Sequence, residues 1–155
     1  MSENIKVDIY TDGSSRGNPG PGGFGLVMES PGFPTKEVSG GFRKTTNNRM
    51  ELLAVIVGLE LLKKPNVDVT IYSDSKYVVD AIEKKWVFGW QKKGFVGKKN
   101  PDLWRRFLPL YQKFKPQMVW IKGHNNHPQN ERCDKLAVAA ALKPNLPPDP
   151  WFESE

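Results

Sequence analysis

Four acidic side chains carry the chemistry that this sequence is best equipped to perform: Asp12, Glu51, Asp74 and Asp134. Carboxylate oxygens are the ligands that hard divalent cations such as Mg²⁺ prefer. A single aspartate at a strand end or a helix start is more often a turn or capping residue than a metal ligand. Glu51 and Asp134 lie in otherwise apolar segments, where an unpaired carboxylate is costly and a shared metal ion offsets the cost. The set therefore favours a divalent metal site.

A zinc site is the competing interpretation of one part of the chain, with His124, His127, Cys133 and Asp134 as candidate ligands. A structural zinc site needs two well-spaced ligand pairs, whereas Cys133 and the adjacent Asp134 must point in different directions on a helix. We therefore interpret His127, which precedes Pro128, as a turn or capping residue. His124 lies in a polar loop and is free to titrate near neutrality.

A glycine-rich run, Gly20-Pro21-Gly22-Gly23-Phe24-Gly25, matches the G-x-G-x-x-G pattern of dinucleotide-binding loops. That motif should open a helix, but the residues that follow, Phe24 to Met28, have the composition of a strand. We interpret the run as a hairpin between two antiparallel strands and expect no nucleotide cofactor.

The spacing of apolar residues divides the chain into strand and helix candidates. Period-two alternation and turn residues predict five strands, at Ile5–Ile9, Gly23–Glu29, Lys36–Arg43, Val67–Ile71 and Met118–Lys122. Apolar stripes at helical spacing predict four helices, at Asn47–Lys64, Tyr77–Lys85, Leu103–Phe114 and Pro128–Lys143. This order is typical of an α/β domain with a five-stranded mixed sheet, an antiparallel meander plus parallel strands, flanked by helices.

These elements position the acidic residues. Asp12 and Asp74 directly follow strands, and Glu51 lies in the first turn of a buried helix that Thr46 or Asn47 caps. In open α/β sheets, sites gather at the carboxyl ends of strands and at neighbouring helix starts. Farther along the chain, Pro109 is expected to kink or interrupt its helix.

Length and charge indicate one basic domain. The 155 residues carry a formal net charge of +6, which favours a polyanionic partner. Six lysines crowd one segment with three aromatic residues, a mixture suited to tracking a nucleic-acid backbone: Lys84, Lys85, Lys92, Lys93, Lys98 and Lys99 with Trp86, Trp90 and Phe95. We predict a catalytic domain over residues 1–143 and a flexible, proline-rich tail over 144–155.

The cellular compartment is predicted from what the sequence lacks. Cys133 is the only cysteine, so the chain can form no internal disulfide, as suits a reducing compartment. There is no basic-then-apolar start of a secretory signal, and no apolar run approaches the roughly 20 residues that a membrane helix needs. We expect a cytoplasmic monomer without a membrane partner.

Several motifs occur together in an order and at a spacing that resemble those of bacterial type 1 ribonucleases H. The resemblance covers roughly Val7 to Leu142, and the combination is far more specific than any single motif. The motifs are Thr11-Asp12-Gly13-Ser14, Gly17-Asn18-Pro19-Gly20-Pro21-Gly22-Gly23, Thr45-Thr46-Asn47-Asn48-Arg49-Met50-Glu51-Leu52, Ser73-Asp74-Ser75, Lys122-Gly123-His124 and Asn130-Glu131-Arg132-Cys133-Asp134.

The resemblance implies the fold of ribonuclease H and the hydrolysis of the RNA strand of an RNA–DNA hybrid, which leaves a 3′-hydroxyl and a 5′-phosphate. Two Mg²⁺ ions are the implied cofactor, with Mn²⁺ as an alternative. Asp12, Glu51, Asp74 and Asp134 match the metal-binding carboxylates, and His124 matches the mobile loop histidine. Further residues match positions of substrate contact: Asn18, Thr46, Asn47, Asn48, Lys76, Trp86, Trp90, Lys92, Lys93 and Trp104.

Three positions depart from the family pattern. Lys76 stands where close relatives carry glutamine, which puts a base or sugar contact in doubt and favours a phosphate contact instead. Phe95 replaces a tryptophan, and Pro109 interrupts a helix that usually lacks proline. None of these departures affects the four carboxylates.

Two other functions are compatible with parts of the pattern. A polynucleotidyl transferase, such as a transposase or a Holliday-junction resolvase, shares the fold and an acidic metal site, but the Thr-Asn-Asn-Arg-Met-Glu motif and the small size argue against it. A non-catalytic hybrid-binding module should have lost at least one carboxylate, and none is lost here.

Overall fold

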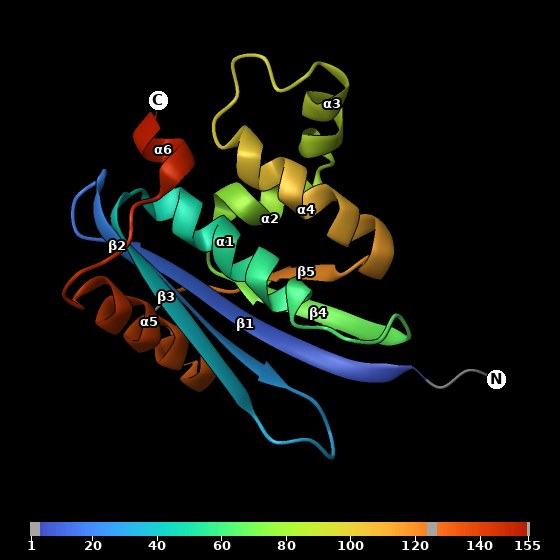
Figure 1. Ribbon diagram of the computed structural model, residues 1–155. Helices are drawn as coiled ribbons and strands as arrows, with labels where there is room; N and C mark the ends of the chain where they lie inside the picture. Colours follow the sequence, from blue (N-terminus) through green and yellow to red (C-terminus); the bar gives the residue numbers. More distant parts are fainter. Residues whose placement is uncertain (1–3, 124–126, 155) are drawn as a thin grey trace.

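The computed structural model describes residues 4–123 and 127–154 and places a five-stranded mixed sheet at the centre of the molecule (Figure 1). In spatial order the strands are β3, β2, β1, β4 and β5. β1 pairs antiparallel with β2 and parallel with β4, β2 pairs antiparallel with β3, and β4 pairs parallel with β5. The α/β class and the mixed sheet predicted from the sequence are therefore confirmed. The strands span Ile5–Ser15 (β1), Gly20–Glu29 (β2), Lys36–Thr45 (β3), Val67–Ser73 (β4) and Gln117–Trp120 (β5).

Helices cover both faces of the sheet. α5 packs against β1, β2 and β3 on one face, and α1 packs against β1 and β2 on the other, with α4 stacked on α1 (Figure 1). None of the helices in the described part of the chain has the length and apolar character that a membrane crossing requires. The helices span Asn47–Glu60 (α1), Lys76–Glu83 (α2), Trp86–Lys92 (α3), Pro101–Phe114 (α4), Pro128–Ala141 (α5) and Pro150–Ser154 (α6).

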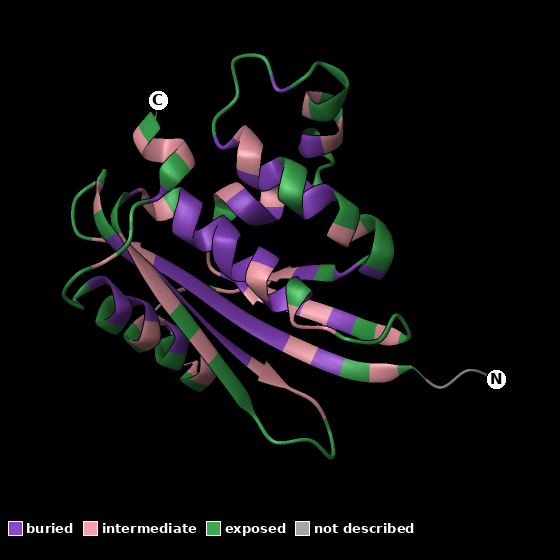
Figure 2. Ribbon diagram, in the orientation of Figure 1, coloured by how far each residue is buried: buried purple, intermediate pink, exposed green. Residues whose placement is uncertain are grey.

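α1 is buried along nearly its whole length because it lies between the sheet and α4 (Figure 2). An all-round apolar helix is stable only in such a sandwich. Thr46 is the N-cap, and its side chain accepts a hydrogen bond from the Arg49 backbone N–H. The helix ends at Glu60, four residues before the predicted end, and the backbone N–H of its C-cap residue, Leu61, donates to the Val57 carbonyl.

β1 continues beyond the point where the sequence predicts its end. Its parallel pairing with β4 stops at Tyr10, opposite Tyr72, but Ser14 and Ser15 still pair with the glycine-rich start of β2. The glycine run is thus part of an antiparallel hairpin, as predicted. Asp12 lies inside the strand rather than after it, at a place where β4 no longer covers that side of β1.

Pro109 does not interrupt α4, so the sequence expectation of a break is wrong. Proline removes one backbone hydrogen bond to the carbonyl four residues earlier, here that of Arg105. Both residues are exposed, so water can satisfy that carbonyl. The opposite side of α4 buries Trp104, Phe107 and Leu108. The free energy gained by burying these side chains exceeds the cost of the one backbone hydrogen bond that Pro109 removes.

Within the proline-rich segment, residues 149–154 make tertiary contacts that their composition does not predict. Asp149 is buried, and the residues after it form the short helix α6 beside β3 (Figure 1). Composition predicts a frayed tail because it contains no information about partners elsewhere in the chain. The partner here is Arg49 in α1, whose guanidinium binds the Asp149 carboxylate.

Candidate active site

Three of the four predicted carboxylates meet where β1, α1 and the end of β4 come together. Asp12 comes from β1, Glu51 from the first turn of α1, and Asp74 directly follows β4. Each offers one carboxylate oxygen, and these oxygens all lie within 4.8 Å of one another. Among the described residues this is the only group of three or more potential metal ligands at such distances.

Gly13 allows two of these carboxylates to approach each other. A β-carbon at this position would lie 2.3 Å from the backbone nitrogen of Glu51, which no side chain can tolerate. β1 and α1 therefore touch backbone to backbone beside the site. Glycine at this position is therefore required for a close helix–strand contact.

Asp134, the fourth predicted ligand, approaches from the other face of the sheet. Its helix, α5, packs closely on β2, since a β-carbon at Gly25 would lie 2.5 Å from the Cys133 carbonyl oxygen. Gly25 pairs directly with Asp12 across the strands. Asp134 is half-buried and lies outside the group of three, but its charge helps to raise the pKa of Asp12.

The electrostatics of the group favour a bound cation. Burial and the neighbouring charge of Asp74 together raise the pKa of Asp12 from 3.8 to about 8, against the opposing hydrogen bond from the Gly13 backbone. Burial and the charges of Asp12 and Asp74 raise the pKa of Glu51 well above its usual value. Glu51 Oε1 and Asp74 Oδ1 are buried without a hydrogen-bond partner among the described residues. Such oxygens fit a hard divalent ion, which would supply the missing positive charge.

In the absence of metal, we expect the protein to lose stability as the pH rises from about 4 to about 8. In this window the folded state keeps a proton on Asp12 that the unfolded chain, with a pKa of 3.8, has released. The folded state therefore binds more protons, and the free energy of unfolding falls as the pH rises. The measurement is Tm in a chelating buffer across this range.

Asp12→Asn is the matched variant for that experiment. It should flatten the decline and raise Tm at about pH 8, because it removes one of the clustered carboxylates. A variant that is less stable than the parent at about pH 8 would instead indicate that Asp12 serves as a structural cap.

The described members of the candidate zinc set have other roles. His127 is the N-cap of α5, and its Nδ1 atom accepts a hydrogen bond from the Asn130 backbone N–H, which confirms the capping interpretation. The buried Cys133 thiol donates to the Tyr10 carbonyl, and burial raises its pKa further from the range of a ligand thiolate. His124 lies outside the described residues.

Polar side chains predicted to contact substrate gather at the start of α1. The Asn18 side-chain oxygen accepts a hydrogen bond from the Asn47 backbone N–H at 3.1 Å. Thr46 and Asn48 flank Asn47, and Asn48 is exposed. The hairpin and the helix start therefore form one polar edge, adjoining the helical turn that holds Glu51.

Comparison with known proteins shows the family. The family model for RNase H matches residues 4–142. The ribonuclease H of Desulforamulus reducens is 56% identical over 155 residues, with 96% of each chain covered. That of Nitratidesulfovibrio vulgaris is 51% identical over 151 residues, with 94% of this chain and 96% of the relative covered.

The chain belongs to the ribonuclease H family. It is thus a nuclease, an enzyme that hydrolyses phosphodiester bonds. Among solved structures, LC9-RNase H1, a type 1 RNase H with the type 2 active-site motif, is 31% identical with a TM-score of 0.79, covering 91% of this chain and 74% of its own. LC11-RNase H1 in complex with RNA/DNA hybrid is 28% identical with a TM-score of 0.63, covering 87% and 96%.

In this ribonuclease H, the predicted substrate tryptophans differ in exposure. Trp86 is 47% exposed at the start of α3, and Trp90 is half-buried one turn later. Trp104 is fully buried, and its indole N–H donates to the Tyr77 hydroxyl at 3.0 Å. Trp104 therefore cannot contact a substrate, and the prediction for this residue is corrected. Its ring instead packs edge-on against the ring of Trp90.

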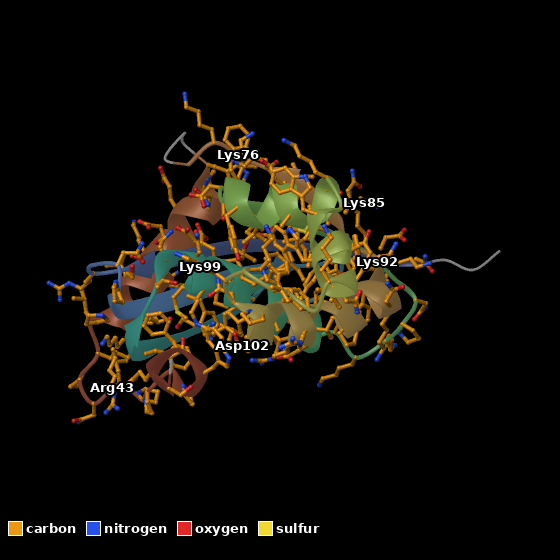
Figure 3. The ribbon with its side chains drawn as sticks, turned by 90° about the horizontal axis from the view of Figure 1, so that it is seen from above. Arg43, Lys76, Lys85, Lys92, Lys99 and Asp102 are labelled. Carbon is orange, nitrogen blue, oxygen red and sulfur yellow. The ribbon has the colours of Figure 1, made fainter. Side chains whose placement is uncertain are left out.

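The lysines of the basic segment extend into solvent around α3. Lys92 and Lys93 are exposed, and the Lys98 ammonium lies 5.2 Å from the centre of the Trp90 ring. Figure 3 labels Lys85, Lys92 and Lys99, which come from the ends of α3 and from the loop that follows it. The sequence does not predict α3 itself, because its single buried residue, Val87, leaves no helical stripe to detect.

One aromatic residue beside the carboxylates lies outside the ribonuclease H sequence motifs. Trp120, at the end of β5, donates its indole N–H to the Asp74 carbonyl at 3.2 Å. The Lys76 ammonium lies 4.1 Å from the centre of the Trp120 ring, within the range of a cation–π contact. Figure 3 shows Lys76 at the surface of the molecule. The one available sequence signal is that a tryptophan ends the last predicted strand.

Proposed function

We propose that this ribonuclease H hydrolyses the RNA strand of RNA–DNA hybrids and leaves a 3′-hydroxyl and a 5′-phosphate. The observation that carries the proposal is the buried cluster of Asp12, Glu51 and Asp74 beside the polar edge at the start of α1. A structural relative, LC11-RNase H1, has been solved in complex with an RNA/DNA hybrid, which supports this choice of substrate.

Divalent ions are the cofactor in this proposal. Asp12, Glu51 and Asp74 would hold one Mg²⁺, and Asp12 with Asp134 a second, so that Asp12 bridges the two. When bound, the ions lower the pKa of the attacking water and neutralise charge on the attacking and leaving oxygens. The unpaired oxygens of Glu51 and Asp74 can serve as ligands without giving up hydrogen bonds. Mn²⁺ prefers similar oxygen ligands and is an alternative.

Two sets of side chains would distinguish the strands of the hybrid. The RNA strand presents 2′-hydroxyls in a wide minor groove, where the amides of Asn18, Asn47 and Asn48 can donate and accept. Thr46 accepts one hydrogen bond from Arg49, so its hydroxyl proton is free to bind a phosphate oxygen of the DNA strand. His124 would move protons or help the product leave.

Lys76 completes the proposed substrate surface. Its ammonium lies over the Trp120 ring next to Asp74 and would contact a phosphate of the hybrid. The cytoplasmic location and the monomeric state expected from the sequence remain predictions.

A cleavage assay tests the proposed function. The protein is incubated with labelled RNA–DNA hybrid, double-stranded DNA and double-stranded RNA, with and without Mg²⁺. We expect cleavage of the RNA strand of the hybrid only, and only with metal. Strand joining or DNA cleavage would indicate a polynucleotidyl transferase, and binding without cleavage would indicate a hybrid-binding module.

The basic segment gives a second prediction. Changing Lys92, Lys93, Lys98 and Lys99 together to alanine should raise KM and leave kcat near that of the parent, because only binding common to ground and transition states is lost. Each lost phosphate contact should flatten the slope of log affinity against log salt by roughly 0.9. Not all four lysines need to touch phosphate, so a change of about two units is expected.

The control removes lysines elsewhere on the surface. Lys63 and Lys64 are exposed after α1, and their replacement by alanine should leave both KM and the salt slope unchanged. If the fourfold variant also leaves both unchanged, the basic segment does not bind the substrate.

A further inference from the structure

The C-terminal segment 149–154 is bound to α1 by a buried ionic network. The Arg49 guanidinium, 3% exposed, donates to Asp149 at 2.8 and 3.0 Å and to Asp102 at 2.8 and 2.7 Å. The Thr45 hydroxyl donates to the same Asp149 carboxylate at 2.8 Å. The Trp151 ring lies against the guanidinium, with its centre 4.9 Å from Arg49 Cζ.

A second set of contacts holds the segment to β3. Arg43 forms an ion pair with Glu153 at 2.9 Å, and its backbone N–H donates to the Pro147 carbonyl. Figure 3 labels Arg43, which binds the segment from β3, and Asp102, which binds Arg49 from α4. A helix of five residues is not stable by itself, so these tertiary contacts fix the position of α6.

This position places two aromatic rings on a groove of about 340 Å³. Asn18 from the loop between β1 and β2 and Thr46 at the start of α1 line the groove, as do Lys98 and Lys99 from the basic segment. Trp151 and Phe152 also line the groove, and both are half-buried. The groove thus joins the polar edge to the basic segment through the C-terminal residues.

The chemistry of the groove fits a nucleic-acid strand. No acidic side chain lines it among the described residues, and Lys98 and Lys99 supply two exposed ammonium groups. Arg49 is neutralised by Asp102 and Asp149, so these lysines are the cations available to a ligand there. Ammonium groups beside aromatic surfaces are the combination that binds phosphates together with sugars or bases.

We propose that Trp151 and Phe152 contact the DNA strand of the bound hybrid, so that the C-terminal segment forms part of the substrate-binding surface. Asn18 and Asn48, assigned above to the RNA strand, line the groove as well. We assign the rings to the DNA strand because Thr46, assigned to its backbone, and the ammonium groups of Lys98 and Lys99, which suit its phosphates, line the same groove. This inference rests on the proposed function. Asp149 is a positioning residue in it, since it holds the segment through Arg49 and does not reach the substrate.

The test is a double variant, Trp151→Ala with Phe152→Ala, compared with Phe33→Ala. Phe33 is 60% exposed and lies just before β3, at the opposite end of that strand from α6. Its replacement by alanine removes a similar aromatic ring from the surface. Hybrid affinity is measured by fluorescence anisotropy without Mg²⁺, and cleavage kinetics are measured with it. We expect the double variant to weaken binding and raise KM by about 10-fold with kcat unchanged, and Phe33→Ala to change neither.

Salt dependence separates an aromatic contact from a change in the lysines. Loss of the rings should weaken binding by the same factor at low and moderate salt, because no counterion is released at an uncharged contact. A flattened slope would mean that the variant disturbs Lys98 and Lys99 instead, and would overturn the proposal. Unaltered affinity and KM would overturn it as well.

The Tm of each variant separates loss of a substrate contact from loss of folding. If the double variant lowers Tm by more than a few degrees, Phe152→Ala alone decides, because Phe152 takes no part in the Arg49 contacts. Asp149→Asn should release the segment and raise KM with both rings still present. If the segment were purely structural, the same change would lower Tm without affecting KM.

Failure of the parent protein to cleave hybrid would refute the proposed function. An active parent with unaltered variants would refute this inference alone.

Discussion

Asp12→Asn is expected to lower the rate of hybrid cleavage by about 10³-fold or more at saturating Mg²⁺. Asparagine has the same shape but lacks the charge that would bridge two ions, and metal ions contribute several kcal/mol of charge stabilisation in the transition state. Hybrid affinity should stay the same or increase, because a charge that repels phosphate is removed. Single-turnover cleavage and anisotropy binding measure the two effects separately.

Asp68→Asn is the control for this experiment. It makes the same chemical change on an exposed carboxylate near the start of β4, away from the cluster. The Asp68 side chain accepts a hydrogen bond from Asn4. Its cleavage rate should match that of the parent. Substantial activity of Asp12→Asn at saturating Mg²⁺ would refute the assignment of Asp12 as a metal ligand.

The largest expected effect on stability comes from Arg49→Ala. The change leaves the 7% exposed Asp149 carboxylate without its cation and also removes the partner of Asp102. Breaking a buried pair by deleting one member typically costs about 3–5 kcal/mol, because the remaining charge is desolvated and unpaired. Urea denaturation at neutral pH, with the slope m compared between variants, measures the loss.

Arg106→Ala provides the comparison for the buried network. Arg106 also binds a carboxylate, that of Glu60, but the two side chains are 46% and 37% exposed. Solvent screens such a pair, so its loss should cost no more than about 1 kcal/mol. Equal losses for Arg49→Ala and Arg106→Ala would mean that burial of the Arg49 network contributes nothing to its strength.

Local patterns predicted much of the fold. Three of the confirmed predictions depend only on near neighbours in the chain. They are the alternation of apolar and polar residues along β1 and β4, the N-cap at Thr46 and the strand character of the glycine run. Boundaries were less accurate where a distant partner extends or ends an element. β1 gains five residues beyond Tyr10, for instance, because β2 continues to pair with it after β4 has ended.

The candidate site was likewise predictable in its residues but not in its contacts. Residue type, order and spacing selected the four carboxylates, and the structure brings Asp12, Glu51 and Asp74 within ligand distance of one another. Exposure was not predictable. Trp104 lies at a family tryptophan position, yet it is buried under Trp90, because exposure depends on which helices cover a position.

By itself, the sequence determined the order of strands and helices, the four acidic residues and the family to which the chain belongs. All three follow from the periodicity of apolar residues and from the spacing of motifs along the chain. Only the tertiary structure decided the position of the C-terminal segment. Proline content predicts disorder for residues 144–155, but the buried Arg49 guanidinium, about 100 residues away, needs the Asp149 carboxylate to balance its charge. Such a pairing depends on distance in space and leaves no local pattern in the chain.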